Sequence, residues 1–252
     1  MINQVKSKLR SGEIVVGSWH YIPSAALTEI IGLIGYDFVV IDMEHGPIET
    51  ETAEQMVRAT ELSGVTPLIR IAFNTPHLIL RALDTGAAGV HVPNVNNAKQ
   101  AEAMVASANY APQGSRGLAG VRAAKYGLKG SLSAYTVEAN QECMVIAQVE
   151  SIEAIHNLDD LLSVEGIDVY YLGPVDLSNS LGIPGQTKDP RVVNNVENAI
   201  KRIVAAGKTA GCIAADVKEA QRYIDLGARY IATHAVRFMV NGSREFLEGV
   251  RR

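Results

Sequence analysis

The chain has little of what marks secreted or membrane proteins. Only two of its 252 residues are cysteine, Cys143 and Cys212, and both lie in or beside apolar runs. We interpret them as small core residues rather than as a disulfide or a nucleophile. The most apolar region, residues 30–41, is interrupted by Asp37 and is too short to span a bilayer. The first eight residues have no apolar stretch of the signal-peptide kind. These absences predict a cytoplasmic protein with no membrane partner.

Neither sign of charge is in large excess. The chain has 27 acidic and 23 basic residues, which gives a formal net charge of −4. Because no basic stripe or arginine-rich run occurs, nucleic acid is not expected as a partner. Hydrophobic residues make up 47% of the chain and charged residues 20%, which is ordinary for a globular protein with a large core.

Short apolar runs alternate with helical patterns along almost the whole chain. The candidate strands are residues 14–19, 38–43, 67–71, 89–93, 144–149, 169–172, 210–213 and 230–233. The candidate helices are residues 25–34, 52–62, 76–83, 98–108, 153–162, 191–206, 217–226 and 237–250. Eight strand-then-helix units in a chain of this length predict an α/β fold, a (β/α)₈ barrel, as a single domain over residues 1–252. The connection 109–142, between the fourth and fifth strands, is the longest and is expected to be functional.

Two acids follow successive candidate strands. Asp176 lies just after a Gly-Pro break that ends the strand 169–172, where a helix should begin. Such a turn brings together a carboxylate and free backbone N–H groups, so it can hold a cation and an anionic ligand. Glu150 ends the preceding strand. We predict that Glu150 and Asp176 bind Mg²⁺ or Mn²⁺, with water and substrate oxygens as the other ligands. The alternative is that each acid merely caps the helix after it.

Three polar residues end the second and third strands, at the end of a barrel where catalytic groups lie. His45 is the candidate general base, because its ordinary pKa is close to neutrality. Asp42 could hold the His45 imidazole in one tautomer. Arg70 could stabilise an enolate or carboxylate oxygen. The competing interpretations are a loop-capping role for His45 and a structural salt bridge for Arg70.

Two further residues are candidates for contact with substrate. Gln148 is expected to point into the barrel beside the metal and to orient a water or a substrate oxygen. Trp19, the single tryptophan, could wall the pocket. Core packing is the alternative for both side chains.

Taken together, these segments resemble the HpcH/HpaI aldolase family, the metal-dependent class II pyruvate aldolases. The resemblance covers nearly the whole chain. It rests on the segments 17–19, 42–47, 110–117, 148–150 and 173–185 and on Arg70. The chain departs from many family members at Met43 and Gly46 and in the segment after residue 117.

The resemblance implies a chemical role for the residues of the metal and carboxylate sites. Glu150 and Asp176 would bind a divalent cation, Mg²⁺ or Mn²⁺ with Co²⁺ as a further candidate, that chelates pyruvate. Backbone N–H groups near Val175 and Asp176 would hold the pyruvate carboxylate. Arg122, in the altered segment, would reach towards the far end of the substrate.

The resemblance also implies a reaction and an assembly. His45, oriented by Asp42, would remove the proton from the hydroxyl at carbon four of a 4-hydroxy-2-oxo acid. Cleavage would release an aldehyde and leave a metal-bound pyruvate enolate that Arg70 stabilises. Family members form homohexamers built from dimers that exchange their last helix, so a homo-oligomer is expected.

Three other activities remain open at this point. A citrate-lyase-β-like enzyme would cleave acyl-coenzyme A esters on the same barrel. A decarboxylase of 2-oxo diacids such as oxaloacetate would form the same enolate. A non-catalytic barrel would only bind a keto acid.

Overall fold

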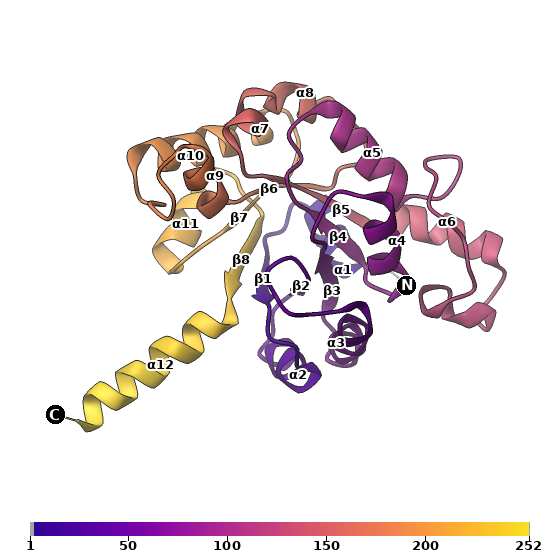
Figure 1. Cartoon of the computed structure of the whole chain (residues 1–252), viewed down its shortest axis with the longest axis horizontal. Helices are drawn as coiled ribbons and strands as arrows, with labels where there is room; N and C mark the ends of the chain where they lie inside the picture. The colour runs from indigo at the N-terminus through magenta and orange to yellow at the C-terminus, as the bar shows by residue number, and fades with distance from the viewer. Residues whose placement is uncertain (1–2, 252) are drawn as a thin grey trace.

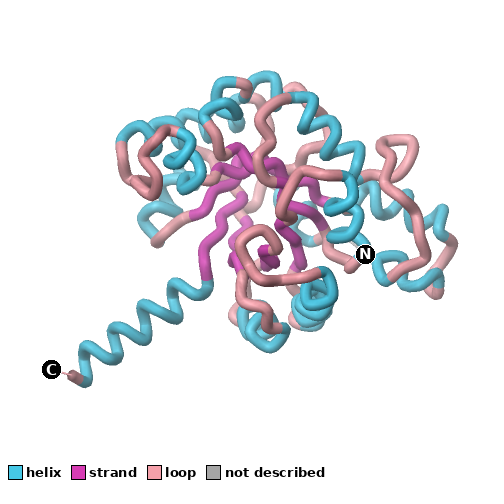
Figure 2. The backbone as a smooth tube through the Cα atoms, viewed as in Figure 1, coloured by secondary structure: helices cyan, strands magenta, loops and turns pink. Residues whose placement is uncertain are grey.

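A closed barrel of eight parallel strands forms the centre of the molecule, as the computed structural model, which describes residues 3–251, shows in Figures 1 and 2. The strands are β1 (Val15–His20), β2 (Phe38–Asp42), β3 (Thr66–Arg70), β4 (Gly89–Val92), β5 (Met144–Val149), β6 (Val169–Leu172), β7 (Ala210–Ile213) and β8 (Tyr230–His234). The barrel closes where β1 pairs with β8, with Val15 opposite Tyr230. The (β/α)₈ prediction is therefore confirmed.

Helices surround the strands (Figure 2). The predicted ones are α2 (Ala25–Leu33), α3 (Thr50–Leu62), α4 (Pro76–Asp84), α5 (Ala98–Ala108), α7 (Ile152–His156), α8 (Leu158–Leu162), α10 (Pro190–Ala205), α11 (Val217–Asp225) and α12 (Ala235–Val250). The pattern 153–162, expected to be one helix, is divided into α7 and α8 at Asn157, whose side chain donates to the Asn96 carbonyl at 2.9 Å. No helix in residues 3–251 is long and apolar enough to cross a membrane.

Four further short elements complete the chain. They are α1 (Gln4–Arg10), the 3₁₀ helix η1 (Arg122–Gly127), α6 (Leu132–Glu142) and α9 (Pro174–Ser180). Two of them, η1 and α6, lie in the long connection between β4 and β5, at one side of the barrel (Figure 1). The fourth, α9, occupies the turn after β6 where the sequence predicts a helix start.

The strands separate two apolar cores, because alternate side chains of a strand point to opposite faces. One core fills the barrel interior and includes Trp19, Phe38, Leu68 and Tyr171, among others. The other lies between the strands and the surrounding helices. Val5 and Leu9 of α1 belong to the interior core, so α1 closes the barrel at the amino-terminal ends of the strands.

Helix α12 is the exception to this packing. It projects away from the barrel (Figure 1), and none of its described side chains is buried. Because α12 is the helix that follows β8, no helix in residues 3–251 covers the seam between β8 and β1. Val16 of β1 is accordingly 40% exposed, although it lies on the face that helices normally cover.

Candidate active site

The carboxyl ends of β2 and β3 place Asp42 and Arg70 side by side, because the two residues are paired in register. Arg70 donates from Nε to Asp42 Oδ1 at 2.8 Å and from Nη2 to Asp42 Oδ2 at 2.5 Å. Its third nitrogen, Nη1, lies 3.0 Å from Glu44 Oε2. Arg70 and Asp42 are buried. Burial alone would raise the pKa of Asp42, but the hydrogen bonds and charge of Arg70 hold that pKa below its usual value. The guanidinium is therefore fixed by two carboxylates.

Asp42 contacts His45 through the main chain. Its Oδ1 atom accepts hydrogen bonds from the backbone N–H groups of Glu44 at 3.0 Å and of His45 at 3.2 Å. The expected contact between Asp42 and the imidazole is not among the hydrogen bonds of the described residues. The His45 side chain is exposed at the barrel mouth. Asp42 thus sets the conformation of the loop that carries His45.

Glu150 is buried at the end of β5, and both of its carboxylate oxygens accept hydrogen bonds. Its Oε1 accepts from the backbone N–H of Asn94 at 2.8 Å, and its Oε2 accepts from Gln148 Nε2 at 2.7 Å. Burial raises the pKa of Glu150 to about 7, and the negative charges of Asp176 and Glu44 add to this effect against the two hydrogen bonds. A buried carboxylate among other acids is a place where a cation is favourable.

Asp176 lies in the first turn of α9, across a small space from Glu150. A Cβ atom built on Gly173 would be 3.0 Å from Glu150 Oε2 and 3.9 Å from Asp176 Oδ2, so the glycine keeps this space open. The Oε1 atom of Gln148 is buried and has no hydrogen-bond partner among the described residues. Two carboxylates with a spare amide oxygen beside them fit a divalent cation with oxygen ligands. Within residues 3–251 no three His, Cys, Asp or Glu side chains form such a cluster, so the protein would supply two acids.

Trp19 lies beneath the site rather than beside it. The Arg70 guanidinium carbon is 4.5 Å from the centroid of the Trp19 ring, a cation–π distance. Trp19 Nε1 donates to Tyr171 Oη at 2.8 Å, and His91 Nε2 lies 2.7 Å from Tyr230 Oη. Trp19 is 2% exposed, so it supports Arg70 from the barrel interior.

Arg122 lies away from this site within the chain, and its predicted role at the far end of a substrate stays a prediction. Its Nη1 donates to the Thr85 carbonyl and its Nη2 to Glu61 Oε2, both at 2.5 Å. Thr85 follows α4 and Glu61 is in the last turn of α3, so both lie at the amino-terminal ends of the strands. A buried guanidinium needs acceptors for its N–H groups, and Arg122 finds them at the end of the barrel opposite the acids.

Two residues of the mouth were not singled out from the sequence. Asn94 follows β4 with a φ of 54°, in the left-handed region that asparagine tolerates, and this turns its N–H towards Glu150. His234 ends β8, where burial and the charges of Arg237 and Arg70 lower its pKa. The Pro93-Asn94 pair after β4 was a usable signal for a turn. Val175 has a 58% exposed side chain, and the contact predicted for it is through its backbone N–H.

A barrel that gathers two acids and a fixed arginine at the carboxyl ends of its strands has the architecture of an enzyme active site. Residues 16–236 match the HpcH/HpaI aldolase/citrate lyase family, and the chain belongs to that family. It is 38% identical over 232 residues to a pyruvate aldolase of Rhizobium etli, which covers 92% of this chain and 90% of the relative. It is 37% identical over 230 residues to a 2-keto-3-deoxy-L-rhamnonate aldolase of Escherichia coli, with coverage of 91% and 86%.

Solved structures agree with the sequence matches. A crystal structure of an HpcH/HpaI aldolase/citrate lyase family protein from Burkholderia cenocepacia superimposes with a TM-score of 0.94 at 31% identity. The match covers 99% of this chain and 100% of that protein. The predictions of the family and of a carbon–carbon lyase of the aldolase type are confirmed.

Proposed function

We propose that this aldolase cleaves 4-hydroxy-2-oxo acids to pyruvate and an aldehyde with the help of a divalent cation. The observation that carries the proposal is the space beside Gly173, flanked by Glu150 and Asp176. A pyruvate aldolase and a 2-keto-3-deoxy-L-rhamnonate aldolase among the relatives support it.

Glu150 and Asp176 would hold the cation, which when bound supplies a Lewis acid for the 2-oxo group. Hard oxygen ligands favour Mg²⁺ or Mn²⁺, with Co²⁺ as a third candidate. The backbone N–H groups of Val175 and Asp176 lie in the first turn of α9, where no helical partner is available to them, and would bind the substrate carboxylate.

Arg70 and His45 would act on the negative charge and on the proton that move in the reaction. Arg70 is locked by Asp42 and Glu44 and would stabilise the negative charge that develops on the enolate oxygen. His45, exposed at the mouth, would take the proton from the hydroxyl at carbon four as the bond between carbons three and four breaks. The aldehyde leaves, and a proton added at carbon three completes pyruvate.

The protein would work as a homo-oligomer in the cytoplasm. Helix α12 leaves its own barrel, and Val16 of β1, beside the seam that α12 would cover, is 40% exposed. An α12 helix from a second protomer fits such a seam, as in the exchanged dimers that the family resemblance implies. The expected assembly is a hexamer built from three of these dimers.

The test is proton NMR of pyruvate in D₂O, which reports the enolate chemistry without knowledge of the aldehyde. We expect loss of the methyl signal after addition of Mg²⁺ or Mn²⁺ to chelator-treated protein. We expect no loss with Glu150→Ala or Asp176→Ala, and wild-type behaviour with Glu165→Ala, which removes an exposed acid. Exchange that persists in the two site variants, or none with any divalent metal, would contradict the proposal. Release of carbon dioxide from oxaloacetate in parallel samples tests the decarboxylase alternative.

A further inference from the structure

A basic cleft lies at the end of the barrel opposite the active site. It has a volume of about 400 Å³ and is formed by α1 and the segments that enter β6, β7 and β8. Its charged lining residues are Lys6, Arg10, Asp168, Lys208 and Arg229. Four positive charges and one negative charge therefore meet here, in a chain whose formal net charge is −4.

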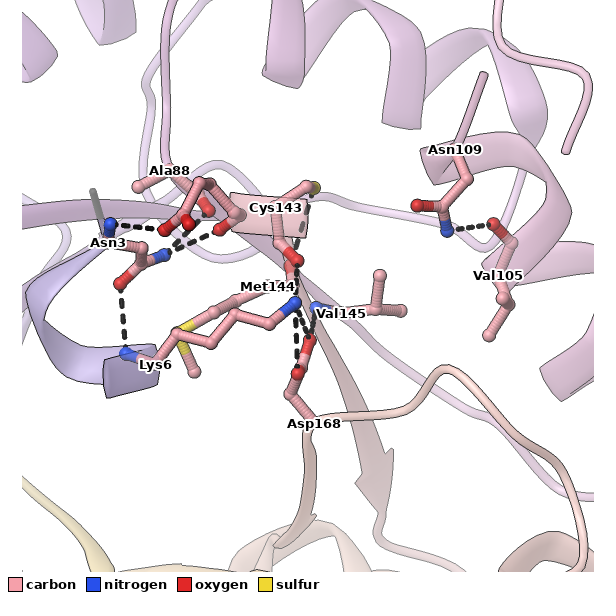
Figure 3. A network of polar contacts seen from close by, with 10 residues as sticks. Asn3, Lys6, Ala88, Val105, Asn109, Cys143, Met144, Val145 and Asp168 are labelled. Carbon is pink, nitrogen blue, oxygen red and sulfur yellow. Dashed lines mark hydrogen bonds and ion pairs between the residues drawn. The ribbon is translucent and has the colours of Figure 1, made fainter. Parts of the chain in front are cut away.

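The one acid among the described lining residues is already neutralised. Figure 3 shows the Lys6 ammonium directed at the Cys143 carbonyl and at Asp168. Lys6 Nζ lies 2.6 Å from the carbonyl oxygen and 3.1 Å from Asp168 Oδ1. Asp168 Oδ2 also accepts from the backbone N–H of Val145 at 2.9 Å. This partly buried network forms the floor of the cleft, and it uses the negative charge of Asp168, so Asp168 does not pair with Arg10, Lys208 or Arg229.

The three remaining cations are poorly compensated. Arg10 and Arg229 make no ion pair within residues 3–251, and Arg10 acts on Asp168 only through its charge. Lys208 lies 3.1 Å from Glu165, but the Glu165 side chain is 88% exposed. Solvent screens such a surface contact, and its contribution is about 0–1 kcal/mol. The cleft therefore keeps a positive potential.

Partial charges of the backbone reduce this potential without reversing it. The carboxyl ends of α1, α10 and α11 lie near the cleft, and each helix end carries roughly half a negative charge. Three full positive charges exceed that sum. Two of them are guanidinium groups, whose forked N–H donors match the oxygens of phosphate better than they match a single point charge.

We propose that this cleft binds a phosphate group, as inorganic phosphate or as the phosphoryl group of a small metabolite. The bound oxyanion would lie against Arg10 and Arg229, with Lys208 at the rim and the Lys6–Asp168 pair as the floor. The site is separate from the acids at the carboxyl ends of the strands, so the inference does not depend on the proposed reaction.

Isothermal titration calorimetry of the intact oligomer with inorganic phosphate and with adenosine monophosphate, at constant ionic strength, tests the site. We expect saturable binding that is weakened at least about tenfold in the double variant Arg10→Gln/Arg229→Gln. Lys99→Gln/Lys218→Gln removes the same two charges from exposed positions elsewhere and should bind as the wild type does. Circular dichroism melting verifies that each variant is folded, and Arg229→Glu, a single charge reversal, gives a second test.

The two ligands distinguish the source of the phosphate group. Equal affinities indicate a site for free phosphate, whereas tighter binding of adenosine monophosphate indicates a phosphorylated metabolite. Binding that is absent, or that is equally strong in both double variants, would overturn the proposal.

Discussion

At the scale of single residues, Arg70 connects the site to the barrel interior. Its guanidinium forms ion pairs with Asp42 and Glu44 at its edge and a cation–π contact with the Trp19 ring on its face. A lysine has one ammonium instead of a planar fork, so it cannot make these three contacts together. The position is therefore specific for arginine on grounds of geometry as well as charge.

We expect Arg70→Lys to lower the rate of pyruvate proton exchange about a hundredfold, because an oxyanion donor would be misplaced. The rate would be followed by proton NMR at saturating metal. Arg191→Lys is the matched control: the Arg191 guanidinium also pairs with a carboxylate, that of Asp189, but its side chain is 57% exposed and contacts none of the proposed site residues. An unchanged rate in Arg70→Lys would rule out the role assigned to this side chain.

His91 gives a second prediction at this scale. It is 0% exposed, and burial lowers its pKa well below the ordinary value. The unfolded chain then binds more protons than the folded one below about pH 6.5, so stability must fall as the pH drops through that range. His91→Gln keeps a partner for the Tyr230 hydroxyl but cannot titrate.

The urea midpoint at fixed protein concentration should therefore fall less between about pH 7.5 and pH 5.5 in His91→Gln than in the wild type. His20 and His234 also have lowered pKa values through burial, so some pH dependence should remain. His77→Gln, on the exposed side of α4, is the control. An equal fall in His91→Gln and the wild type would show that His91 does not contribute.

At the scale of elements, α9 and the loop after it act as one unit. Ser178 Oγ donates to the Val175 carbonyl at 2.6 Å and accepts from the Gly185 N–H at 2.9 Å. The hydroxyl thus ties the loop back onto the short helix that presents Asp176. This connection makes residues 173–185, one of the segments on which the family resemblance rests, a single structural unit.

Gly173 at the start of α9 provides a test of the metal site. We expect Gly173→Ala to weaken Mn²⁺ binding about tenfold or more, because the added methyl group would enter the space beside Glu150 Oε2. The φ of Gly173 is −105°, so alanine is compatible with the backbone and the effect should be local. Calorimetry with chelator-treated protein measures the affinity. Gly120→Ala, where an added Cβ meets nothing within 4 Å, is the control. Tight Mn²⁺ binding by Gly173→Ala would place the metal elsewhere.

The strands were predictable because both faces of a barrel strand are buried. The predicted bounds of β5, β6 and β7 agree with the structure, since each of these strands is a short, mainly apolar run. Helix α1 was not predicted, because only Val5 and Leu9 are apolar in its seven residues and both are used to close the barrel. That use depends on tertiary structure, which periodicity alone does not contain.

The site was predictable to the extent that it follows from strand ends. Glu150, Asp176 and Arg70 lie at the mouth because the barrel gathers carboxyl ends there. The backbone N–H of Asn94 carries no side-chain signal, and the position of Arg122 depends on how the long connection folds. Sequence patterns identify the residues that end a strand, but not the partners that reach them from loops.

At the scale of the whole molecule, α12 is a helix with no buried side chain among its described residues. Phe246 is 69% exposed and Phe238 is 50% exposed, although both side chains are large and apolar. Burial of one such side chain contributes roughly 1.5–3 kcal/mol, so several together can hold two protomers.

We expect Phe246→Asp to shift the molecular mass in light scattering from an oligomer towards the single 27.0 kDa chain. Asn241→Asp adds the same charge to α12 on its polar side and should leave the oligomer intact. If Phe246→Asp retains the wild-type mass, α12 does not form the contact proposed for it.

The closure of the barrel by β1 and β8 has a consequence during synthesis. β1 ends at residue 20 and its second neighbour begins at residue 230, so nearly the whole chain must leave the ribosome before that edge is paired. Until then, the backbone groups from Val15 to Trp19 that pair with β8 remain open to other strands. The nascent protein therefore carries an unprotected strand edge for almost the entire time that it is being made, and the last strand of the fold is the one that removes the risk of aggregation.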